Sequence, residues 1–394
     1  DSALVISGGP GTGKTTIVQF LISIFDMSGI DYALCAPTGR AAKRMSEATE
    51  QEARTIHRLL EYGIDEESGD LVFKRNAERP IEEKAIIVDE MSMVDIFLFM
   101  QLMRALRTGT RLIMIGDSNQ LPSVGAGNVL HDIIASGVVK NIELNTVYRQ
   151  GEGSAISSNA HLVNSGQMPV AAPEEFDIVE LGGPEDIWQY LKSICAGGGV
   201  QVIAPMKKGG AGVIELNARL QQLCNPPSPA KAECNSMGNV LRVGDKVMQT
   251  KNDYRMEWKK DNGQYVENGL GVFNGDMGEI IQINAVLREI TVRFDDDRVA
   301  VYEFAQADEL ERSYAITVHK SQGSEFDCIA IPILNGPPML YTRNLLYTAI
   351  TRAKKRVWLL GRKYAISTMI ANDKTKERFT GLRRALEEMY HAPK

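Results

Sequence analysis

Cysteine is scarce in this chain, whose 394 residues contain five widely separated cysteines. None shows the C-x-x-C spacing of a zinc or redox site, and a chain of this length needs no disulfide framework. The sequence has no signal peptide and no apolar run near the roughly 20 residues of a membrane span. Positive charge is not in excess, because the formal net charge is −6. A negative net charge argues against a protein that binds a polyanion over its whole surface. It does not exclude a local basic site that binds one. These absences favour a reduced, cytoplasmic protein without a membrane partner.

The length of the chain predicts two or three domains, each with its own core. Apolar strands alternate with helical patterns along most of the sequence, which predicts an α/β class. Asp1 stands almost at the start of the first predicted strand. We therefore expect the chain to be a fragment of a longer protein.

The first motif is glycine-rich and lies between an apolar strand at 3–6 and a helical run at 17–25. From Gly8 it reads G-x-x-x-x-G-K-T, the pattern of a loop whose backbone N–H groups surround phosphates. Lys14 is expected to reach the outer phosphates, and the Thr15 hydroxyl to hold Mg²⁺. The alternative, a glycine turn that only caps a helix, does not explain the lysine and threonine. The predicted nucleotide-binding residues are Gly9, Pro10, Gly11, Thr12, Gly13, Lys14, Thr15 and Thr16.

Two further strand ends carry candidate catalytic residues. The buried strand at 84–88 ends in Asp89 and Glu90, at the sheet edge where doubly wound folds bind ligands. We expect Asp89 to hold Mg²⁺ through water and Glu90 to position the attacking water, rather than to cap a helix. Gln120 follows the strand at 110–116, where its amide either senses a γ-phosphate or lies on the surface.

Basic side chains follow the second strand of the same region. Residues 37–44 begin a helix with Thr, Gly and three cations, which favours binding of an anion. A solvated basic face is the alternative. Residues 53–60 add more cations. Residues 62–80 then predict a small hairpin, which is either a surface loop without a functional role or a functional element that projects from the core.

The second half of the chain predicts another α/β core. It starts near residue 200 and has no phosphate loop of its own. Between about 240 and 310, short alternating strands separated by Asn-Gly and Asp-rich turns predict a small β-barrel. The bases and aromatics of 252–260 either stack on nucleic acid or form an exposed loop. The hydroxyls, His and Lys of 317–321 are suited to contact a phosphate backbone.

Taken together, these motifs resemble those of superfamily 1 helicases, and most closely the RecD-type DNA helicases. The segments that carry the resemblance occur in that family's order, at 8–15, 36–42, 88–93, 116–122, 147–150, 314–325 and 346–353. The resemblance implies two RecA-like P-loop NTPase domains that hold ATP between them, with single-stranded DNA running across both. It also implies ATP-driven 5′ to 3′ translocation and unwinding in repair or recombination. We expect the first domain at 1–150 with a hairpin, the pin, at about 60–80, and the second at 151–394 with an SH3-like β-barrel at about 240–310.

The resemblance also assigns roles to individual residues. Arg149 and Arg352 are expected to act on the γ-phosphate, Arg352 as an arginine finger, and Gly323 and Glu325 to face the ribose. The predicted DNA-binding residues are Pro37, Thr38, Gly39, Arg40, Lys43, His57, Asn252, Thr317, His319, Lys320 and Ser321.

Other functions for a phosphate-loop protein remain open at this point. A nucleotide-controlled switch or loader would bind DNA or protein without tracking a strand. A structural subunit would have no use for Lys14, Asp89, Glu90 and Arg352, and a P-loop kinase would have no use for the second core. The expected partners are single-stranded DNA and duplex junctions, with protein partners in a repair or nuclease complex as an open alternative.

Overall fold

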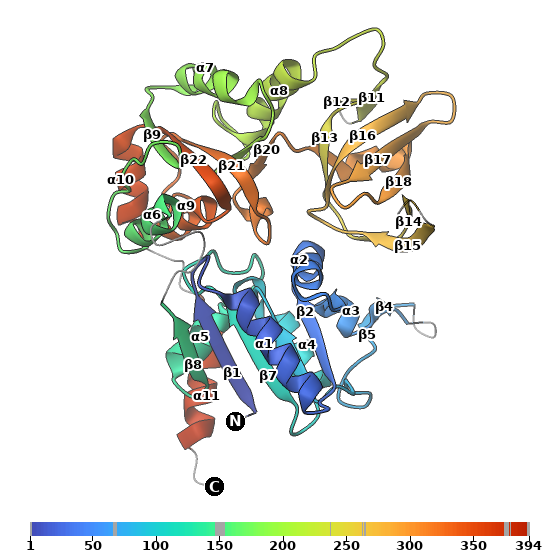
Figure 1. The fold of residues 1–394 in the computed structure, drawn as a ribbon, viewed down its shortest axis with the longest axis vertical. Coiled ribbons are helices and arrows are strands. Elements are labelled where there is room, and N and C mark those ends of the chain that lie inside the picture. Colours follow the sequence, from blue (N-terminus) through green and yellow to red (C-terminus); the bar gives the residue numbers. More distant parts are fainter. Residues whose placement is uncertain are drawn as a thin grey trace. The chain divides into compact units, whose positions relative to one another are not determined.

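The computed structural model describes residues 2–65, 69–145, 154–236, 238–261, 263, 265–373, 378 and 380–391. The chain divides into two compact units (Figure 1). Unit 1 contains residues 1–165 and 373–394, and unit 2 contains residues 166–372. We expected the break at 150 and all of 151–394 in the second domain. In the structure the segment after the break and the C-terminal segment both belong to unit 1.

Unit 1 is built on a six-stranded sheet with the order β3-β2-β6-β7-β1-β8, whose paired strands are all parallel. Buried apolar runs form its central strands, as is usual when helices cover both faces of a sheet. The strands are β1 (Ala3–Gly8), β2 (Tyr32–Ala36), β3 (Ala53–Thr55), β6 (Ala85–Val88), β7 (Arg111–Gly116) and β8 (Lys140–Leu144). The parallel arrangement brings the ends of β1, β6 and β7, where the predicted catalytic residues lie, to one edge of the sheet.

Helices pack on both faces of this sheet. Val18, Ile22 and Phe25 form the buried stripe of α1 on one face. Phe99 and Leu102 of α4 pack on the other face. The helices of unit 1 are α1 (Lys14–Met27), α2 (Gly39–Thr49), α3 (Ile56–Leu59), η1 (Met91–Met93), α4 (Ile96–Ala105), α5 (Val129–Ser136), α6 (Ala155–Asn164) and α11 (Leu382–His391).

The predicted hairpin is present as β4 (Tyr62–Ile64) and β5 (Leu71–Phe73), which pair antiparallel. At its base the rings of Tyr62 and Phe73 lie 4.6 Å apart. Toward its end Ile64 pairs with Leu71, and these side chains are 48% and 61% exposed. Residues 66–68 lie outside the described residues.

The C-terminal segment is fastened to unit 1 by Arg378. Its Nη1 donates to the carbonyls of Ser123, Gly125 and Gly127 at 2.6, 2.7 and 2.8 Å. These carbonyls belong to the loop that follows Gln120. Further along, α11 packs on α5, and Leu382 and Leu386 contact the unit 1 core. The i, i+4 spacing of these leucines places them on one face of the helix.

Replacing Arg378 with alanine is expected to destabilise unit 1 by about 2 kcal/mol, because hydrogen bonds to a charged donor are among the stronger ones. All three tryptophans lie in unit 2, so loss of secondary structure on heating, followed by far-UV circular dichroism, is the suitable measurement. Arg384→Ala removes an exposed arginine that pairs with Glu388 on α11, and it should change stability by less than about 0.5 kcal/mol. Equal effects of the two variants would contradict an anchoring role for Arg378.

Unit 2 contains a second parallel sheet with the order β20-β10-β21-β22-β9. Its strands are β9 (Phe176–Glu180), β10 (Val200–Ala204), β20 (Ala315–Thr317), β21 (Phe326–Ile333) and β22 (Ala353–Gly361). Its helices are α7 (Pro184–Cys195), α8 (Val213–Cys224), η3 (His319–Ser321), α9 (Arg343–Ile350) and α10 (Lys363–Ala371). None of the helices in the described ranges is long and apolar enough to cross a membrane.

An antiparallel β insertion interrupts unit 2 between β10 and β20, as predicted from the alternating pattern. Its seven-stranded sheet has the order β15-β14-β18-β17-β16-β13-β19 around its own apolar core. The strands are β13 (Lys246–Gln249), β14 (Asp253–Asp261), β15 (Val266–Val272), β16 (Met277–Asn284), β17 (Glu289–Phe294), β18 (Val299–Glu303) and β19 (Leu310–Arg312). The turn η2 (Phe304–Glu309) precedes β19, and the hairpin of β11 (Glu233–Ser236) and β12 (Asn239–Arg242) precedes β13.

Candidate functional site

The phosphate-loop motif forms a tight turn between β1 and α1. Gly11 and Gly13 have φ values of 74° and 85°, a left-handed conformation that glycine adopts without strain. A Cβ atom at Gly8 would lie 2.6 Å from Thr12 Oγ1. The start of α1 has no side-chain cap, so its first N–H groups remain available to an anion.

Lys14, the first residue of α1, folds back over this loop. Its Nζ donates to the carbonyls of Gly8 and Gly9, both at 2.7 Å. Thr12 Oγ1 donates to the same Gly9 carbonyl at 2.9 Å. Thr15 and Thr16 are exposed. Because neutral carbonyls hold the amine, a phosphate would be a stronger acceptor for it.

The predicted acidic pair lies at the end of β6, and its two side chains have different partners. Asp89 Oδ1 accepts from the Glu90 N–H at 2.8 Å. Burial, followed by the charge of Glu90, raises the pKa of Asp89, while Arg44 and Lys14 oppose this rise. Asp89 follows β6 at the same edge of the parallel sheet as the phosphate loop, which follows β1. Glu90 is buried, and its Oε1 pairs with Arg44 Nη2 at 3.0 Å.

Gln120 lies past the end of β7 and is 6% exposed, so the alternative of a surface amide is excluded. Its Nε2 donates to Asp117 Oδ2 at 3.3 Å. Its Oε1 has no hydrogen-bond partner among the described residues. A buried acceptor without a partner is costly, which makes it a place for a water molecule or a ligand. Its contact with a γ-phosphate remains a prediction.

The basic segment after β2 is largely committed to local contacts. Thr38 caps α2 by accepting from the Ala41 N–H at 3.2 Å, and Lys43 pairs with Glu47 at 3.4 Å. Pro37, Gly39 and Arg40 are half-buried. This arrangement leaves the predicted DNA contacts of these residues untested.

His57 lies on α3 against the base of the hairpin. Its ring is 5.5 Å from Tyr62 and 5.8 Å from Phe73. Burial lowers the pKa of His57, although Asp95 opposes this effect. A neutral His57 packed on aromatic rings favours support of the hairpin over an ionic contact with DNA.

In unit 2 the predicted DNA-binding turn follows the end of β20. His319 is exposed, and Lys320 Nζ pairs with Glu311 Oε2 at 2.8 Å. Thr317 Oγ1 accepts from the Lys320 N–H at 3.3 Å. Ser321 is fully buried, and its hydroxyl donates to the Val318 carbonyl at 2.7 Å. This placement does not favour the phosphate contact predicted for Ser321.

The remaining predicted residues have separate surroundings. Gly323 has a φ of 73°, which suits glycine, and Glu325 lies 3.9 Å from Lys354 Nζ. Asn252 is exposed on the β insertion, donating to the Tyr254 hydroxyl and accepting from the Asn274 N–H at 2.9 Å. Arg149 lies outside the described residues.

Arg352 follows α9 and is 3% exposed within unit 2. Its guanidinium donates to the carbonyls of Thr348 and Ser324 at 3.1 and 3.3 Å and to Thr351 Oγ1 at 3.2 Å. These three acceptors are neutral oxygen atoms, as are the carbonyls that accept from Lys14.

Three residues that contact the predicted site residues or their loops were absent from the sequence predictions. Arg44 pairs with Glu90, Glu311 pairs with Lys320, and Arg378 anchors the loop after Gln120. The cationic run at 37–44 contained a signal for Arg44. No spacing rule connects the other two to their partners.

Comparison with known proteins gives three family models in succession along the chain. A model described as an AAA domain matches residues 1–126. A model of the ATP-dependent RecD-like DNA helicase SH3 domain matches residues 216–294, and one of the UvrD-like helicase C-terminal domain matches residues 312–360. These matches cover the phosphate loop, the β insertion as far as β17 and the last strands of unit 2.

Two curated relatives extend over nearly the whole chain. The ATP-dependent RecD2 DNA helicase of Deinococcus radiodurans is 34% identical over 91% of this chain, which spans 47% of that relative's length. The RecBCD enzyme subunit RecD of Mycolicibacterium smegmatis is 28% identical over 97% of this chain and 72% of the subunit. The chain therefore spans about half of one of these relatives and about 70% of the other.

Solved structures share the fold. A structure of two coordinating Pif1 helicases on forked double-stranded DNA is similar with a TM-score of 0.57 at 21% identity, covering 98% of this chain and 94% of the other. Bacteroides Pif1 bound to single-stranded DNA gives a TM-score of 0.56 at 19% identity, covering 98% and 93%. These similarities confirm the α/β architecture with two parallel-sheet cores. The three family models and the RecD2 match therefore show that this chain is similar to RecD-like helicases along most of its length.

Proposed function

We propose that this chain is an ATP-driven DNA helicase that moves along single-stranded DNA, 5′ to 3′, and separates duplex DNA in repair or recombination. The observation that carries the proposal is the Lys14 amine, which lies over the uncapped start of α1 and donates to the neutral carbonyls of Gly8 and Gly9. That arrangement suits a triphosphate whose outer phosphates take over the amine. The family's RecD members support DNA as the polymer on which the motor acts.

The residues around the phosphate loop also suit Mg²⁺. Thr15 offers an exposed hydroxyl and Asp89 a carboxylate, and such oxygen donors are the ligands that Mg²⁺ prefers. Within the described ranges, no group of three or more His, Cys, Asp or Glu side chains could hold a metal alone. We therefore propose that phosphate oxygens complete the site. A bound Mg²⁺ would supply neutralisation of charge on the outer phosphates.

The protein side chains divide the remaining work. Glu90, oriented by Arg44, is proposed to position the attacking water and accept its proton. Gln120 is proposed to accept a hydrogen bond from that water through its unpartnered Oε1. Arg149 and Arg352 are proposed to stabilise charge on the γ-phosphate. Because Lys14 and Arg352 belong to different units, their joint action would couple hydrolysis to movement of the units and so to stepping along DNA.

A strand-displacement assay with ATP tests the activity and its direction together. We expect unwinding of a duplex with a 5′ single-stranded overhang and little unwinding with a 3′ overhang. Unwinding from the 3′ overhang alone would reverse the proposed polarity. ATP hydrolysis that does not respond to single-stranded DNA, with no strand displacement, would favour a switch or loader.

Replacing Lys14 with alanine is expected to lower DNA-stimulated ATP hydrolysis about 100-fold or more, because it removes a charge-assisted donor to the phosphates. Steady-state phosphate release measures this effect. Lys363→Ala removes an exposed lysine that pairs with Glu180 in unit 2, and it should retain nearly full activity. A Lys14→Ala rate near that of the wild type would refute the nucleotide site.

The hairpin of β4 and β5 is proposed to be the strand-separating pin. Replacing both exposed apolar residues, Ile64 and Leu71, with serine is expected to reduce unwinding about fivefold or more, because the stacking surface offered to a base pair is lost. The ATPase rate on single-stranded DNA should stay near the wild-type value. Loss of both activities to the same extent would argue against a separating role.

The similar proteins and the free cysteines support proposals about the protein's partners and its location in the cell. The match to RecD subunits of RecBCD enzymes supports protein partners in a repair or nuclease complex. All five cysteines are free, which supports the prediction of a reducing cytoplasm.

A further inference from the structure

Glu311 connects two lysines, one nine positions and the other 104 positions away in sequence. Its Oε2 is 2.8 Å from Lys320 Nζ, and its Oε1 is 3.2 Å from Lys207 Nζ. Burial would raise the pKa of Glu311, but its contacts with Lys320 and Lys207 outweigh burial, and the pKa is lowered. Glu311 is therefore an ionised carboxylate shared by two amines.

The backbone on both sides of the Glu311–Lys320 pair is fixed. Glu311 lies on β19 opposite Met248 of β13, so a sheet holds it in register. Lys320 lies on η3, where its N–H bonds to Thr317 Oγ1. Only the side chains can move without disturbing the fold.

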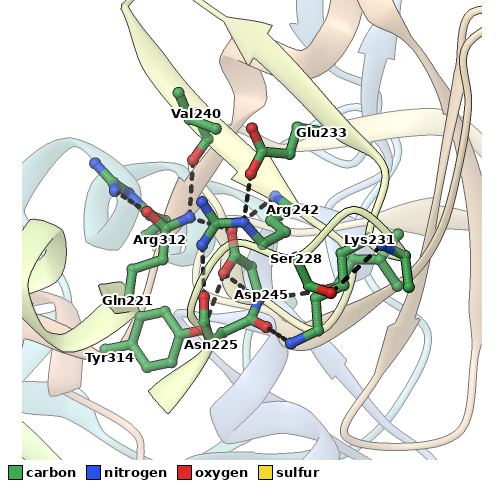
Figure 2. A network of polar contacts seen from close by, with 12 residues as sticks. Gln221, Asn225, Ser228, Lys231, Glu233, Val240, Arg242, Asp245, Arg312 and Tyr314 are labelled. Atoms are coloured by element: carbon green, nitrogen blue, oxygen red, sulfur yellow. Dashed lines mark hydrogen bonds and ion pairs between the residues drawn. The ribbon is translucent and has the colours of Figure 1, made fainter. Parts of the chain in front are cut away.

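A buried polar network next to Glu311 makes β19 more rigid still. Figure 2 shows Asp245 among Gln221 of α8, Asn225 directly after that helix, Arg312 of β19 and Tyr314. Arg312 Nη1 donates to Gln221 Oε1 at 2.6 Å, and the Tyr314 hydroxyl donates to Asp245 Oδ1 at 3.0 Å. Arg312 directly follows Glu311, so this network restrains the backbone of β19 next to Glu311.

We propose that Glu311 is an internal competitor for the DNA backbone, occupying the amines of Lys320 and Lys207 that would otherwise bind phosphates. This inference rests on the proposed function, because it concerns the residues that would grip single-stranded DNA. A carboxylate and a phosphate oxygen demand the same donors, so a phosphate must displace Glu311 to gain these lysines. The competition weakens the grip of unit 2 on DNA, and a motor that must release the strand at each step benefits from a weaker grip.

The test is binding of fluorescent oligothymidylate by anisotropy over a series of salt concentrations, without nucleotide. Glu311→Gln keeps the shape of the side chain and removes its charge. It is expected to bind about fivefold tighter at low salt, with a dependence of log K on log salt that is steeper by about 0.7 for each lysine released to phosphate. Glu311→Ala should show the same direction of change.

Three variants make the result specific. Asp308→Asn also removes one negative charge next to β19, but its partner is Lys251, at 3.1 Å, so it should leave affinity and salt dependence close to the wild type. Adding Lys320→Ala to Glu311→Gln should remove most of the gain, and Lys207→Ala should remove the rest.

The outcomes separate this inference from the proposed function. If the wild type binds DNA and both Glu311 variants bind equally well or more weakly, Glu311 orients the lysines and the competition is refuted. If Asp308→Asn gains as much as Glu311→Gln, the effect is one of net charge, and the competition is again refuted. If the wild type neither binds DNA nor responds to it in ATP hydrolysis, the proposed function fails as well.

Discussion

Replacing Arg352 with alanine is expected to lower the kcat of DNA-stimulated ATP hydrolysis about 1,000-fold or more, with the KM for ATP nearly unchanged. An arginine that reaches the γ-phosphate acts mainly on charge that develops in the transition state, so its loss reduces kcat. The guanidinium of Arg352 donates to the Thr348 and Ser324 carbonyls and to a hydroxyl, each a weaker acceptor than a phosphate oxygen. Measured steady-state rates with saturating single-stranded DNA test this result.

Arg352 is buried, so a fall in activity must be separated from a loss of structure. Tryptophan fluorescence during denaturation reports on unit 2, where Trp188, Trp258 and Trp358 all lie. Arg352→Lys keeps the charge but loses the planar fork, and it is expected to recover only a small part of the activity. Arg362→Ala, an exposed arginine of the same unit, should hydrolyse ATP at nearly the wild-type rate. An Arg352→Ala rate within tenfold of the wild type would exclude the finger role.

The sequence predicted the parts of this molecule whose signal is local. The phosphate loop could be predicted because its strand, glycines, lysine and helix follow one another directly in the sequence. The β insertion could be predicted because its strands alternate apolar and polar residues and are separated by Asn-Gly turns. In both cases neighbouring residues decide the structure.

The failed or missing predictions concern contacts between distant residues. Arg44 and Glu90 are 46 positions apart, and Arg378 binds carbonyls more than 250 positions away. The order of the chain suggested that α11 belongs with the second domain, yet its Leu382 and Leu386 pack on the core of unit 1. An amphipathic stripe predicts that a helix is covered, but it does not name the surface that covers it.

The sequence also does not predict which side chains of a motif are buried. Ser321 and His319 stand two residues apart in the predicted DNA-binding turn, but one is fully buried and the other exposed. The tight turn of η3 directs the serine hydroxyl onto the Val318 carbonyl. A motif therefore locates a DNA-binding segment more reliably than it assigns each of its side chains.

Replacing Asp245 with alanine is expected to destabilise unit 2 by about 3–5 kcal/mol, because it leaves several buried donors without an acceptor. Asp245 is fully buried. Its carboxylate accepts from the Asn225 amide at 2.7 Å, the Arg242 N–H at 2.8 Å and the Tyr314 hydroxyl at 3.0 Å, and also from the Gln221 amide. Denaturant unfolding followed by tryptophan fluorescence measures the loss.

Graded variants test whether hydrogen bonds are the cause. Asp245→Asn keeps the size of the side chain but turns an NH₂ group toward donors, so a loss of about 2 kcal/mol or more is expected. Tyr314→Phe removes one donor and should cost about 1 kcal/mol, and it should cost less once Asp245 is alanine. Asp327→Asn removes an exposed carboxylate paired with Lys355 and should change stability by less than about 0.5 kcal/mol. A loss below 1 kcal/mol for Asp245→Ala would show that water replaces the carboxylate.

The Asp245→Ala variant also tests whether the hydrogen bonds around Asp245 make the core of unit 2 and the β insertion unfold together. Gln221 belongs to α8 of the core and Asn225 directly follows that helix, whereas Arg242 and Asp245 lead into the insertion (Figure 2). Trp258 lies in the insertion, and the other two tryptophans lie in the core. Proteins that keep one tryptophan at a time should therefore show coincident transitions in the wild-type background. With Asp245→Ala, the Trp258 transition should separate from that of the core, since the buried bonds that join the two parts are lost.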